Sequence, residues 1–256
     1  TVRGGNPGLA PEIADTLVAG LVYEPSWLEG LRFSADWYEI SIADAIVQIG
    51  LQEIVDRCEE GDPEQCANIQ RDPVSTQISR IIQKQFNLAA DFIEGYDFEV
   101  QYSMEPNLFD SQFESFRIRA LGGVLLDKTS TSSSGRVTDQ MGAYSLPELT
   151  ANITANYNIG PYGLQLQGRH IDGGKLSRTW VEGVDVDDNS VSSSTWWNGQ
   201  LSYNGEMNNG GTWRVSLSVQ NLFDDSPPII AGGTTGAQRM NNQYDIYGRR
   251  YALGLN

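Results

Sequence analysis

The side chains most able to do covalent chemistry are two cysteines and one histidine. Cys58 and Cys66 flank the acidic segment EEGDPEQ, and the chain's single histidine, His170, lies far from both in the sequence. Two cysteines at this separation could form a disulfide or could supply two thiolates to a metal site. A thiolate metal site normally needs further cysteine or histidine ligands. We therefore expect no metal site and no cofactor.

Recognisable catalytic patterns are missing from the sequence. One histidine supports no Ser/His/Asp set, and no GxSxG, HExxH or phosphate-cradling glycine loop occurs in a suitable context. Acidic residues around the cysteines could bind calcium, but they lack the every-second-residue spacing of a dedicated calcium loop, and a solvated face is favoured. These residues are Glu53, Asp56, Glu59, Glu60, Asp62 and Glu64. We do not expect an enzyme.

Charged residues that alternate with apolar ones form the remaining candidate set. Guanidinium and carboxylate groups on one face of a sheet could contact a substrate, but cross-strand ion pairs, with Asp97 and Glu99 among the acids, are the default interpretation. The candidate substrate contacts are Arg32, Asp36, Arg117, Arg119, Arg169 and Arg214.

The elements that must position these residues follow from period-two alternation. In the stretches 213–220, 149–158 and 96–103, every second residue is apolar and the residues between are polar. Alternation separates the two kinds of side chain onto opposite faces of a strand, whereas helical spacing would scatter them around a cylinder. We therefore predict an all-β, antiparallel fold of about nine strands. They cover roughly residues 13–23, 30–42, 87–103, 114–127, 148–158, 161–171, 194–204, 212–221 and 248–256.

The predicted connections between these strands alternate in length. Connections 43–86 and 172–193 are long, whereas 24–29 and the single residue Gly160 are tight. In an up-and-down sheet this alternation places all the long loops at one end, as in outer-membrane barrels. The sequence has no apolar run of about 18 residues for a spanning helix, but a barrel strand needs only about ten alternating residues. We predict an up-and-down transmembrane β-barrel with long extracellular loops.

Composition and charge narrow the possible partners. The 256 residues carry a formal net charge of −16 at pH 7. A chain this acidic repels phosphate backbones, so nucleic-acid binding is not expected.

Five segments of the sequence resemble one known family, in that family's order. They are GGNPGLAPEIADTLVAGLVYEPSWLEGLRFSADWYEISIADAI (4–46), the Cys58 and Cys66 pair with IQRD after it, GYDFEV (95–100), VQNLFDDSPP (219–228) and YDIYGRRYALGLN (244–256). Together they resemble the C-terminal part of a TonB-dependent outer-membrane receptor. The resemblance implies a plugged barrel in the outer membrane of a Gram-negative bacterium that imports a scarce nutrient with energy from the TonB complex. It also implies that the motif Asn221, Leu222, Phe223 and Asp224 closes the penultimate strand and that 225–247 is the last extracellular loop.

We expect residues 1–256 to be an incomplete, C-terminal portion of such a barrel. The sequence contains no recognisable plug domain, and an odd number of strands cannot close antiparallel. The partners expected for the whole receptor are the TonB complex, contacted through the missing plug domain, outer-membrane lipid and lipopolysaccharide, and a small-molecule or oligosaccharide ligand.

The loop that carries the cysteines should have structure of its own. In an oxidising location Cys58 and Cys66 are expected to form a disulfide. The segment 44–58 spaces its isoleucines as an amphipathic helix does, and Ile78, Ile81, Ile82 and Phe86 could supply the apolar partner. The loop could act as a lid over a binding site or could simply be a compact surface loop.

Two other functions remain open from the sequence. A passive, porin-like outer-membrane channel would share the alternation and the loop asymmetry, and only the family resemblance separates it from a receptor. A soluble, carbohydrate-active β protein is the more distant alternative, and it would bury its apolar faces between two sheets. The transported substrate, whether carbohydrate, siderophore or similar, is not indicated by the sequence.

Overall fold

A computed structural model describes residues 1–109, 113–131, 135–208, 210–230 and 243–256. The chain divides into two compact units. Unit 1 comprises residues 1–17, 39–93 and 127–139, and unit 2 comprises residues 18–38, 94–126 and 140–256. Each unit is described by itself.

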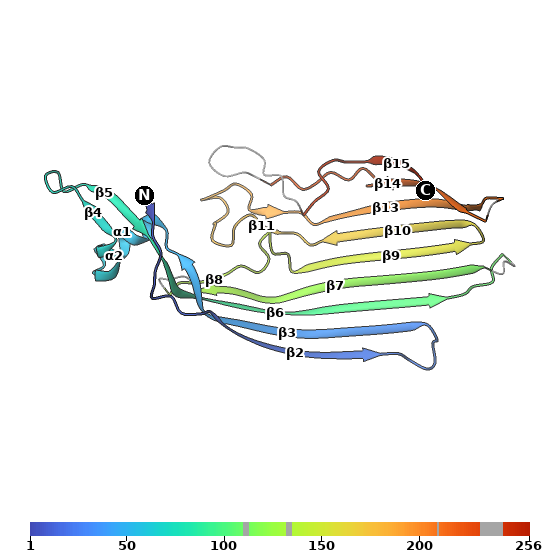
Figure 1. Ribbon diagram of the computed structural model, residues 1–256, viewed down its shortest axis with the longest axis horizontal. Coiled ribbons are helices and arrows are strands. Elements are labelled where there is room, and N and C mark those ends of the chain that lie inside the picture. Colours follow the sequence, from blue (N-terminus) through green and yellow to red (C-terminus); the bar gives the residue numbers. More distant parts are fainter. Residues whose placement is uncertain (110–112, 132–134, 209, 231–242) are drawn as a thin grey trace. The chain divides into compact units, whose positions relative to one another are not determined.

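About half of the described residues belong to one ten-stranded sheet (Figure 1). Its strands are hydrogen-bonded in the order β15-β14-β13-β10-β9-β7-β6-β3-β2, and β8 (Val137–Asp139) pairs with the end of β7. The strands on the main path are β2 (Ile13–Tyr23), β3 (Leu31–Gln48), β6 (Gln85–Met104), β7 (Glu114–Thr131), β9 (Leu149–Ile159), β10 (Tyr162–Ile171), β13 (Ser194–Glu206), β14 (Thr212–Gln220) and β15 (Arg250–Leu255). They confirm the nine strands predicted from the alternation.

The strands β3, β6 and β7 continue past their predicted ends. The sequence places these ends at residues 42, 103 and 127, whereas the strands run to Gln48, Met104 and Thr131. About ten residues suffice to cross a bilayer, so beyond that length side chains need not alternate while backbone pairing continues. Alternation therefore underestimates strands that extend beyond the lipid.

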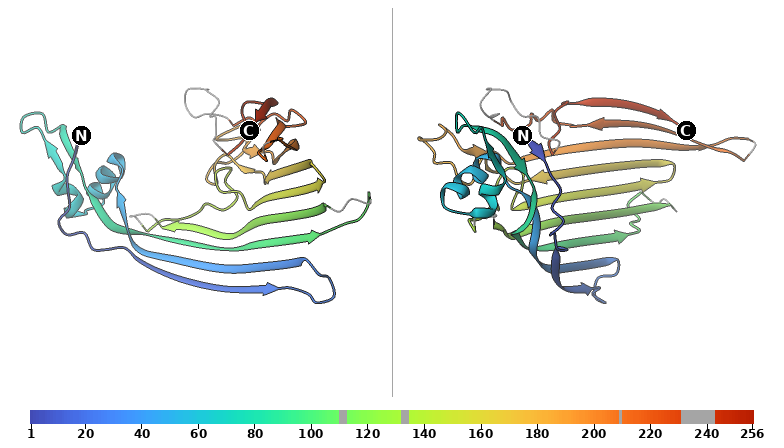
Figure 2. Two further views of the ribbon diagram at one scale, coloured as in Figure 1. Left: turned by 45° about the vertical axis from the view of Figure 1, so that its right-hand side comes forward. Right: turned by 60° about the vertical axis from the view of Figure 1, so that its left-hand side comes forward.

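In unit 2 the strand segments lie side by side in one curved sheet (Figure 2). Among the described residues, β2 and β15 are the two edges of the strand order. The tight turn before β3 depends on Gly30, whose φ is +84°. A Cβ there would lie 1.9 Å from the carbonyl oxygen of Ser103, so only glycine fits this close approach.

The long loops of unit 2 enclose a small hydrophobic core. Ile171 at the end of β10 and Trp196 at the start of β13 are 2% and 8% exposed. They pack with Val191 of β12 (Ser190–Val191) and with Ile230 and Tyr244 of the last connection. Strand β12 pairs with β11 (Gly174–Lys175) inside the same loop. Residues 231–242 of the expected last extracellular loop lie outside the described residues.

Unit 1 contains the loop between β3 and β6. The loop contains α1 (Leu51–Glu59), α2 (Pro63–Ala67), β4 (Ile69–Arg71) and β5 (Ile78–Gln83). Strand β1 (Val2–Arg3), from the first residues of the chain, joins β5 and β4 in a three-stranded sheet in the order β1-β5-β4. None of the described helices is long and apolar enough to cross a membrane.

A disulfide joins Cys58 at the end of α1 to Cys66 in α2, which confirms the predicted pair. The prediction of a helix over residues 44–58 is only partly right, because residues 44–48 continue β3 and the helix begins at Leu51. Residues 44–48 are extended, and side chains bond part of their backbone: the Ile46 N–H donates to Glu12 Oε1 at 2.6 Å, and the Asp44 carbonyl accepts from Asn87 Nδ2 at 2.8 Å. The isoleucine spacing there therefore does not form a helical turn.

The predicted apolar partners of the helix are also partly confirmed. Ile49 and Ile54 are buried against Phe86, and Ile69 and Ile81 pack on this cluster. Ile78 is instead 38% exposed.

The β4–β5 hairpin of unit 1 is closed by a carboxylate. Asp72 Oδ1 accepts hydrogen bonds from the backbone N–H groups of Ser75 at 2.8 Å and Val74 at 2.9 Å, and from the Ser75 hydroxyl at 3.1 Å. These bonds stabilise the ionised form and lower the pKa of Asp72 below its ordinary value. At neutral pH the Asp72 carboxylate is therefore ionised and caps the turn through these three bonds.

Candidate functional site

The strand register of unit 2 gives the sheet one apolar and one polar face. Directly paired residues share a face, and across β10, β13, β14 and β15 the pairs run from Leu164 to Leu201, Leu217 and Leu253. Leu217 and Leu253 are 44% and 79% exposed, so no described part of the chain covers this apolar face. The described residues thus fit the predicted membrane sheet and do not form the two stacked sheets of the alternative, a soluble β protein.

Aromatic side chains gather on the apolar face at the end with the tight turns. The ring centroids of Tyr162 and Tyr203 are 5.1 Å apart, and those of Tyr203 and Trp213 are 5.4 Å apart. Amphipathic rings at strand ends are typical of a sheet whose apolar face meets the boundary between lipid and water.

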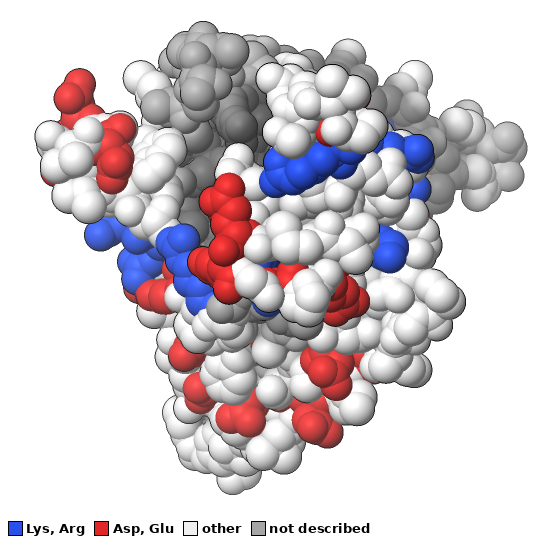
Figure 3. All heavy atoms as spheres, turned by 90° about the vertical axis from the view of Figure 1, so that its left-hand side faces the viewer, with Lys and Arg blue, Asp and Glu red and all other residues white. Residues whose placement is uncertain are grey.

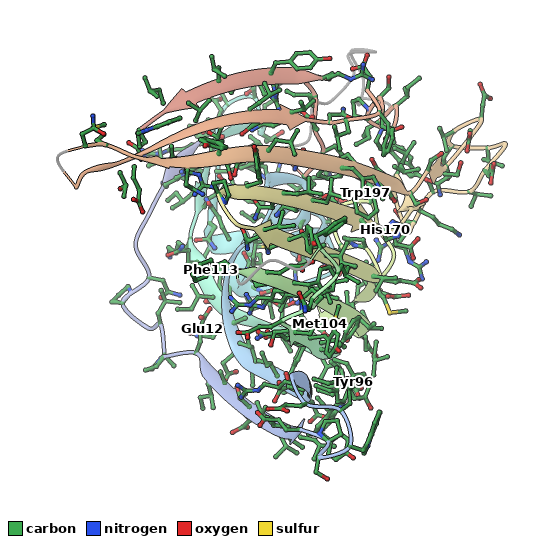
Figure 4. All side chains as sticks on the ribbon, turned by 90° about the vertical axis from the view of Figure 1, so that its right-hand side faces the viewer. Glu12, Tyr96, Met104, Phe113, His170 and Trp197 are labelled. Atoms are coloured by element: carbon green, nitrogen blue, oxygen red, sulfur yellow. A yellow bond between two sulfur atoms is a disulfide. The ribbon has the colours of Figure 1, made fainter. Side chains whose placement is uncertain are left out.

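His170 lies on the apolar face rather than in a catalytic cluster. It pairs with Thr195, and its Nδ1 atom is 2.7 Å from Thr195 Oγ1. Figure 4 shows His170 on the same side of the sheet as Trp197. Within the described residues, no group of three His, Cys, Asp or Glu side chains could hold a metal ion.

The opposite, polar face carries the candidate charged residues, and several of them are engaged by neighbours. Arg119 forms a two-pronged ion pair with Glu99, at 2.6 Å from Nε to Oε1 and 3.1 Å from Nη2 to Oε2. Arg32 Nε lies 3.4 Å from Glu24 Oε1, and this pair is largely exposed. These contacts agree with the interpretation as ion pairs.

The three remaining candidate arginines have no acidic partner among the described residues. Arg214 Nη2 donates to Ser202 Oγ at 3.0 Å, and the Arg169 guanidinium lies 5.3 Å from the centroid of the Trp196 ring. Arg117 has no side-chain partner in the described part of the chain. It lines a hollow of about 920 Å³ with Glu29, Ser103, Glu105, Ser115 and Asn156, among others.

Asp36 lies on the polar face beside a second hollow. This hollow, of about 350 Å³, is lined by Asp36, Asp97 and Glu99 together with the hydroxyl of Thr150 and the amide of Asn152. The structure therefore distributes the six predicted contact residues along the polar face and does not gather them into one pocket. Their role as substrate contacts stays a prediction.

Two rows of uncharged polar side chains, which we call the amide strip, also cross the polar face. The sequence alone gives no signal for these rows, because asparagine and glutamine are common on polar strand faces and only the register aligns them. The first row is Asn156, Gln165, Gln200 and Ser218, which are paired across β9, β10, β13 and β14. The second row is Thr154, Gln167 and Asn198 on β9, β10 and β13.

Asn221 of the family motif is fully buried and forms a turn at the end of β14. Its φ is +53°, a left-handed conformation that asparagine tolerates better than most residues. Its side chain donates to the Asp225 carbonyl and accepts from the Asp225 N–H, both at 2.9 Å. Its own N–H donates to Asn198 Oδ1 at 3.0 Å. The motif therefore lies directly after β14, which ends at Gln220, and its role as a family motif stays a prediction.

The rest of the motif fixes the chain on both sides of this turn. The Leu222 N–H donates to the Trp197 carbonyl at 2.7 Å, while the Phe223 side chain is 67% exposed. Asp224, with φ +60°, accepts a hydrogen bond at 2.8 Å from the N–H of Arg249, the residue before β15. The two ends of the last connection are therefore joined directly.

Acidic and basic groups both reach the surface. Figure 3 shows carboxylates and cationic groups spread over the face in view. Acidic residues prevail overall, with 33 Asp and Glu against 17 Lys and Arg.

These features define the class of protein: an up-and-down antiparallel sheet with an uncovered apolar face and a polar face, joined by alternating long loops and tight turns, is part of a transmembrane β-barrel. The family model for TonB dependent receptor-like β-barrels matches residues 1–222. The chain belongs to this family, whose members lie in the outer membrane of Gram-negative bacteria.

Solved structures share this fold. The ferric enterobactin receptor of Pseudomonas aeruginosa has a TM-score of 0.65 at 16% identity, and the match covers 99% of this chain and 32% of that receptor. The FrpB iron transporter of Neisseria meningitidis has a TM-score of 0.59 at 14% identity, covering 99% and 32%. The outer membrane transporter YddB of Escherichia coli has a TM-score of 0.61 at 10% identity, covering 99% and 33%.

The chain thus spans about a third of the length of these solved proteins. The comparison with curated proteins found no match.

Proposed function

We propose that this chain is a C-terminal portion of the barrel wall of a receptor that actively takes up a nutrient across the outer membrane. The observation that carries the proposal is the two-faced sheet in a member of the TonB-dependent receptor family. The apolar face contacts lipid and lipopolysaccharide, and the polar face lines the water-filled interior through which a solute passes. The TonB complex supplies energy through a plug domain.

The names of the structural relatives suggest candidate nutrients. The solved proteins are described as a ferric enterobactin receptor, an iron transporter and a copper transporter. Among the predicted substrate contacts of this chain, Arg117 and Asp36 are the ones most available to a ligand, because neither has a side-chain partner in the described residues. A small polar molecule that enters from the loop end would meet these side chains along the wall.

The experiment compares uptake in three strains of the source bacterium: the parent, a deletion of the full-length receptor gene, and a deletion of the TonB gene. Labelled iron chelates and neutral oligosaccharides are supplied at concentrations too low for diffusion through general porins to suffice. We expect uptake of one nutrient to be lost in both deletion strains. Uptake that needs the receptor gene but persists without TonB would identify a passive channel instead.

A further inference from the structure

The apolar face of unit 2 carries a groove near the end of the sheet that has the tight turns. The groove has a volume of about 320 Å³ and lies across β9, β10, β13 and β14. Most of its lining side chains are aromatic or aliphatic, and they include Tyr157, Tyr162, Leu164, Leu201, Tyr203 and Leu217. Small-molecule sites have volumes of about 300–1,000 Å³, so this groove suits a slender molecule.

The strand register orders these side chains along the groove. Leu164, Leu201 and Leu217 are paired across β10, β13 and β14, and we call them the leucine row. Tyr162 and Tyr203 are paired one step nearer to the tight turns, two residues along each strand. The groove is therefore aliphatic toward the middle of the sheet and aromatic toward the turns.

The aromatic end of the groove has unused hydrogen-bond donors. The hydroxyls of Tyr162 and Tyr203 and the indole N–H of Trp213, which we call the rim, have no hydrogen-bond partner in the part of the chain that the structure describes. The Tyr157 hydroxyl is not available, because it donates to Glu114 Oε1. An amphiphile with acceptor oxygens beside an acyl chain could bind the rim and the leucine row together.

The described side chains leave this groove open, although they fill other dips on the same face. The ring of Trp197 covers Gly168, where a Cβ would lie 2.8 Å from the ring, and the ring of Trp213 covers Gly205 in the same way. An empty groove would leave its lining atoms without van der Waals contacts. Lipid tails are as apolar as leucine, so shape and hydrogen bonds, rather than the hydrophobic effect, decide which molecule stays in the groove.

The charge around the groove argues against a lipid with several negative charges. The strands β9, β10, β13 and β14 contain two basic residues, Arg169 and Arg214, and the register places both on the polar face. The nearest carboxylate, Glu114, is held beside the groove by Tyr157. The phosphates of lipopolysaccharide would find no cation on the apolar face of these four strands.

The position of the groove also argues for phospholipid. In outer-membrane barrels the tight turns face the periplasm and the long loops face outward. Lipopolysaccharide occupies the outer leaflet, and phospholipid occupies the periplasmic leaflet. A groove beside the tight turns therefore meets phospholipid.

We propose that this groove is a binding site for one zwitterionic phospholipid of the periplasmic leaflet. One acyl chain lies against the leucine row, and the ester and phosphate oxygens accept hydrogen bonds from the rim. The inference goes beyond the proposed uptake function and does not depend on the nutrient. It rests on the assignment of the apolar face to lipid.

The test uses the full-length receptor in vesicles of phosphatidylethanolamine and phosphatidylglycerol. A trace of either lipid carries a photoreactive group in the middle of one acyl chain. Mass spectrometry after illumination maps the lipid adducts along the chain, and heat modifiability on a gel shows that each variant is folded.

Two pairs of variants separate the groove from the rest of the apolar face. Leu201→Trp fills the groove, and Leu253→Trp, paired with the same row on β15 but outside the groove, is its control. Tyr162→Phe/Tyr203→Phe keeps both rings and removes two donors of the rim. Tyr251→Phe, on the apolar face of β15, is the control for the lost hydroxyls.

We expect phosphatidylethanolamine adducts on segments 157–164 and 201–217 to be about ten-fold more frequent than on the apolar face nearer the long loops. Leu201→Trp should lower them to the level of the rest of the face. The double phenylalanine variant should lower them about three- to thirty-fold, because two hydrogen bonds are lost. Both controls should label like the wild type.

Several results would overturn the proposal. They are even labelling along the apolar face, and groove adducts that persist undiminished in Leu201→Trp and in the double phenylalanine variant. Stronger labelling by phosphatidylglycerol than by phosphatidylethanolamine would overturn the zwitterionic class. Receptor-to-receptor adducts at these segments in place of lipid adducts would assign the groove to a second copy of the receptor. If Leu201→Trp does not fold, the double phenylalanine variant decides, since it leaves the packing of the rings unchanged.

Discussion

At the scale of single residues, the structure gives Asn221 of the family motif a clear structural role, whereas the charged candidate residues have none that is comparable. Asn221 joins β14, β13 and the start of the last connection through a buried side chain in a left-handed turn. Arg119 and Glu99, by contrast, satisfy each other on an open face. A buried, fully bonded asparagine is costly to replace, whereas exposed ion pairs contribute little to stability.

Substitution of Asn221 should show two separable effects. Asn221→Gly keeps the left-handed backbone but loses the side-chain bonds, and we expect it to lower stability by about 1 kcal/mol. Asn221→Ala removes the side-chain bonds and also disfavours the left-handed backbone, so we expect it to lower stability by about 2–4 kcal/mol. The measurement is the temperature at which the full-length receptor loses its folded, fast-migrating form on a gel. Equal melting of the two variants would show that the backbone conformation contributes nothing.

At the scale of the strand, the two faces meet different solvents. On β14, Leu217 pairs with Leu201 and Leu253 on the apolar face, while its neighbour Ser218 pairs with Gln200 on the polar face. One residue along the chain therefore separates a lipid contact from a water contact.

This difference gives a matched pair of substitutions. Leu217→Arg places a charge in the bilayer and should cost about 2–4 kcal/mol, whereas Ser218→Arg points into water and should cost less than about 1 kcal/mol. Urea unfolding of the full-length receptor in lipid vesicles measures both. A smaller loss for Leu217→Arg than for Ser218→Arg would reverse our assignment of the faces.

The loop of unit 1 is stabilised as an element of its own. The disulfide between Cys58 and Cys66 closes a short ring between α1 and α2, next to the buried cluster of Ile49, Ile54 and Phe86.

Removal of this disulfide should loosen the loop without unfolding the sheet. Cys58→Ser/Cys66→Ser relaxes the loop's unfolded state and should destabilise the loop by about 2–3 kcal/mol. We expect faster proteolytic cleavage within residues 49–84 on intact cells, mapped by mass spectrometry, with unchanged heat modifiability of the barrel. Wild-type protein treated with a reductant is the control and should be cleaved like the variant.

At the scale of the whole molecule, the strand order has two edges. Within the described residues, β2 and β15 each have one hydrogen-bonded neighbour on the main path of the sheet. Unpaired backbone N–H and C=O groups are costly in lipid, which is why membrane sheets close into barrels. We infer from the apolar face and the two edges that further strands complete the barrel.

We therefore expect residues 1–256 alone not to form a stable membrane protein. Refolding into detergent should yield no heat-modifiable monomer, whereas the full-length receptor refolded in parallel should yield one. A heat-modifiable monomer of the isolated chain would show that the edges are satisfied in some other way.

The sequence by itself determined what depends on local periodicity. Alternation in stretches such as 149–158 and 213–220 located the nine main strands and their faces, because lipid and water select side chains residue by residue. The pairing of Cys58 with Cys66 was also predictable from the sequence, because the two cysteines are close along the chain. The resemblance of segments such as VQNLFDDSPP then indicated the family.

Only the tertiary structure decided which residues meet across strands. The registers aligned Gln165 with Gln200 and Asn156, paired Arg119 with Glu99, and brought Asn221 against Asn198. The tertiary structure also continued β3 through residues 44–48, which were expected to be helical, and the distant side chains of Glu12 and Asn87 bond the backbone there. Such contacts join residues far apart in the sequence, and hydrogen bonding between neighbouring strands, which no local pattern encodes, sets their alignment.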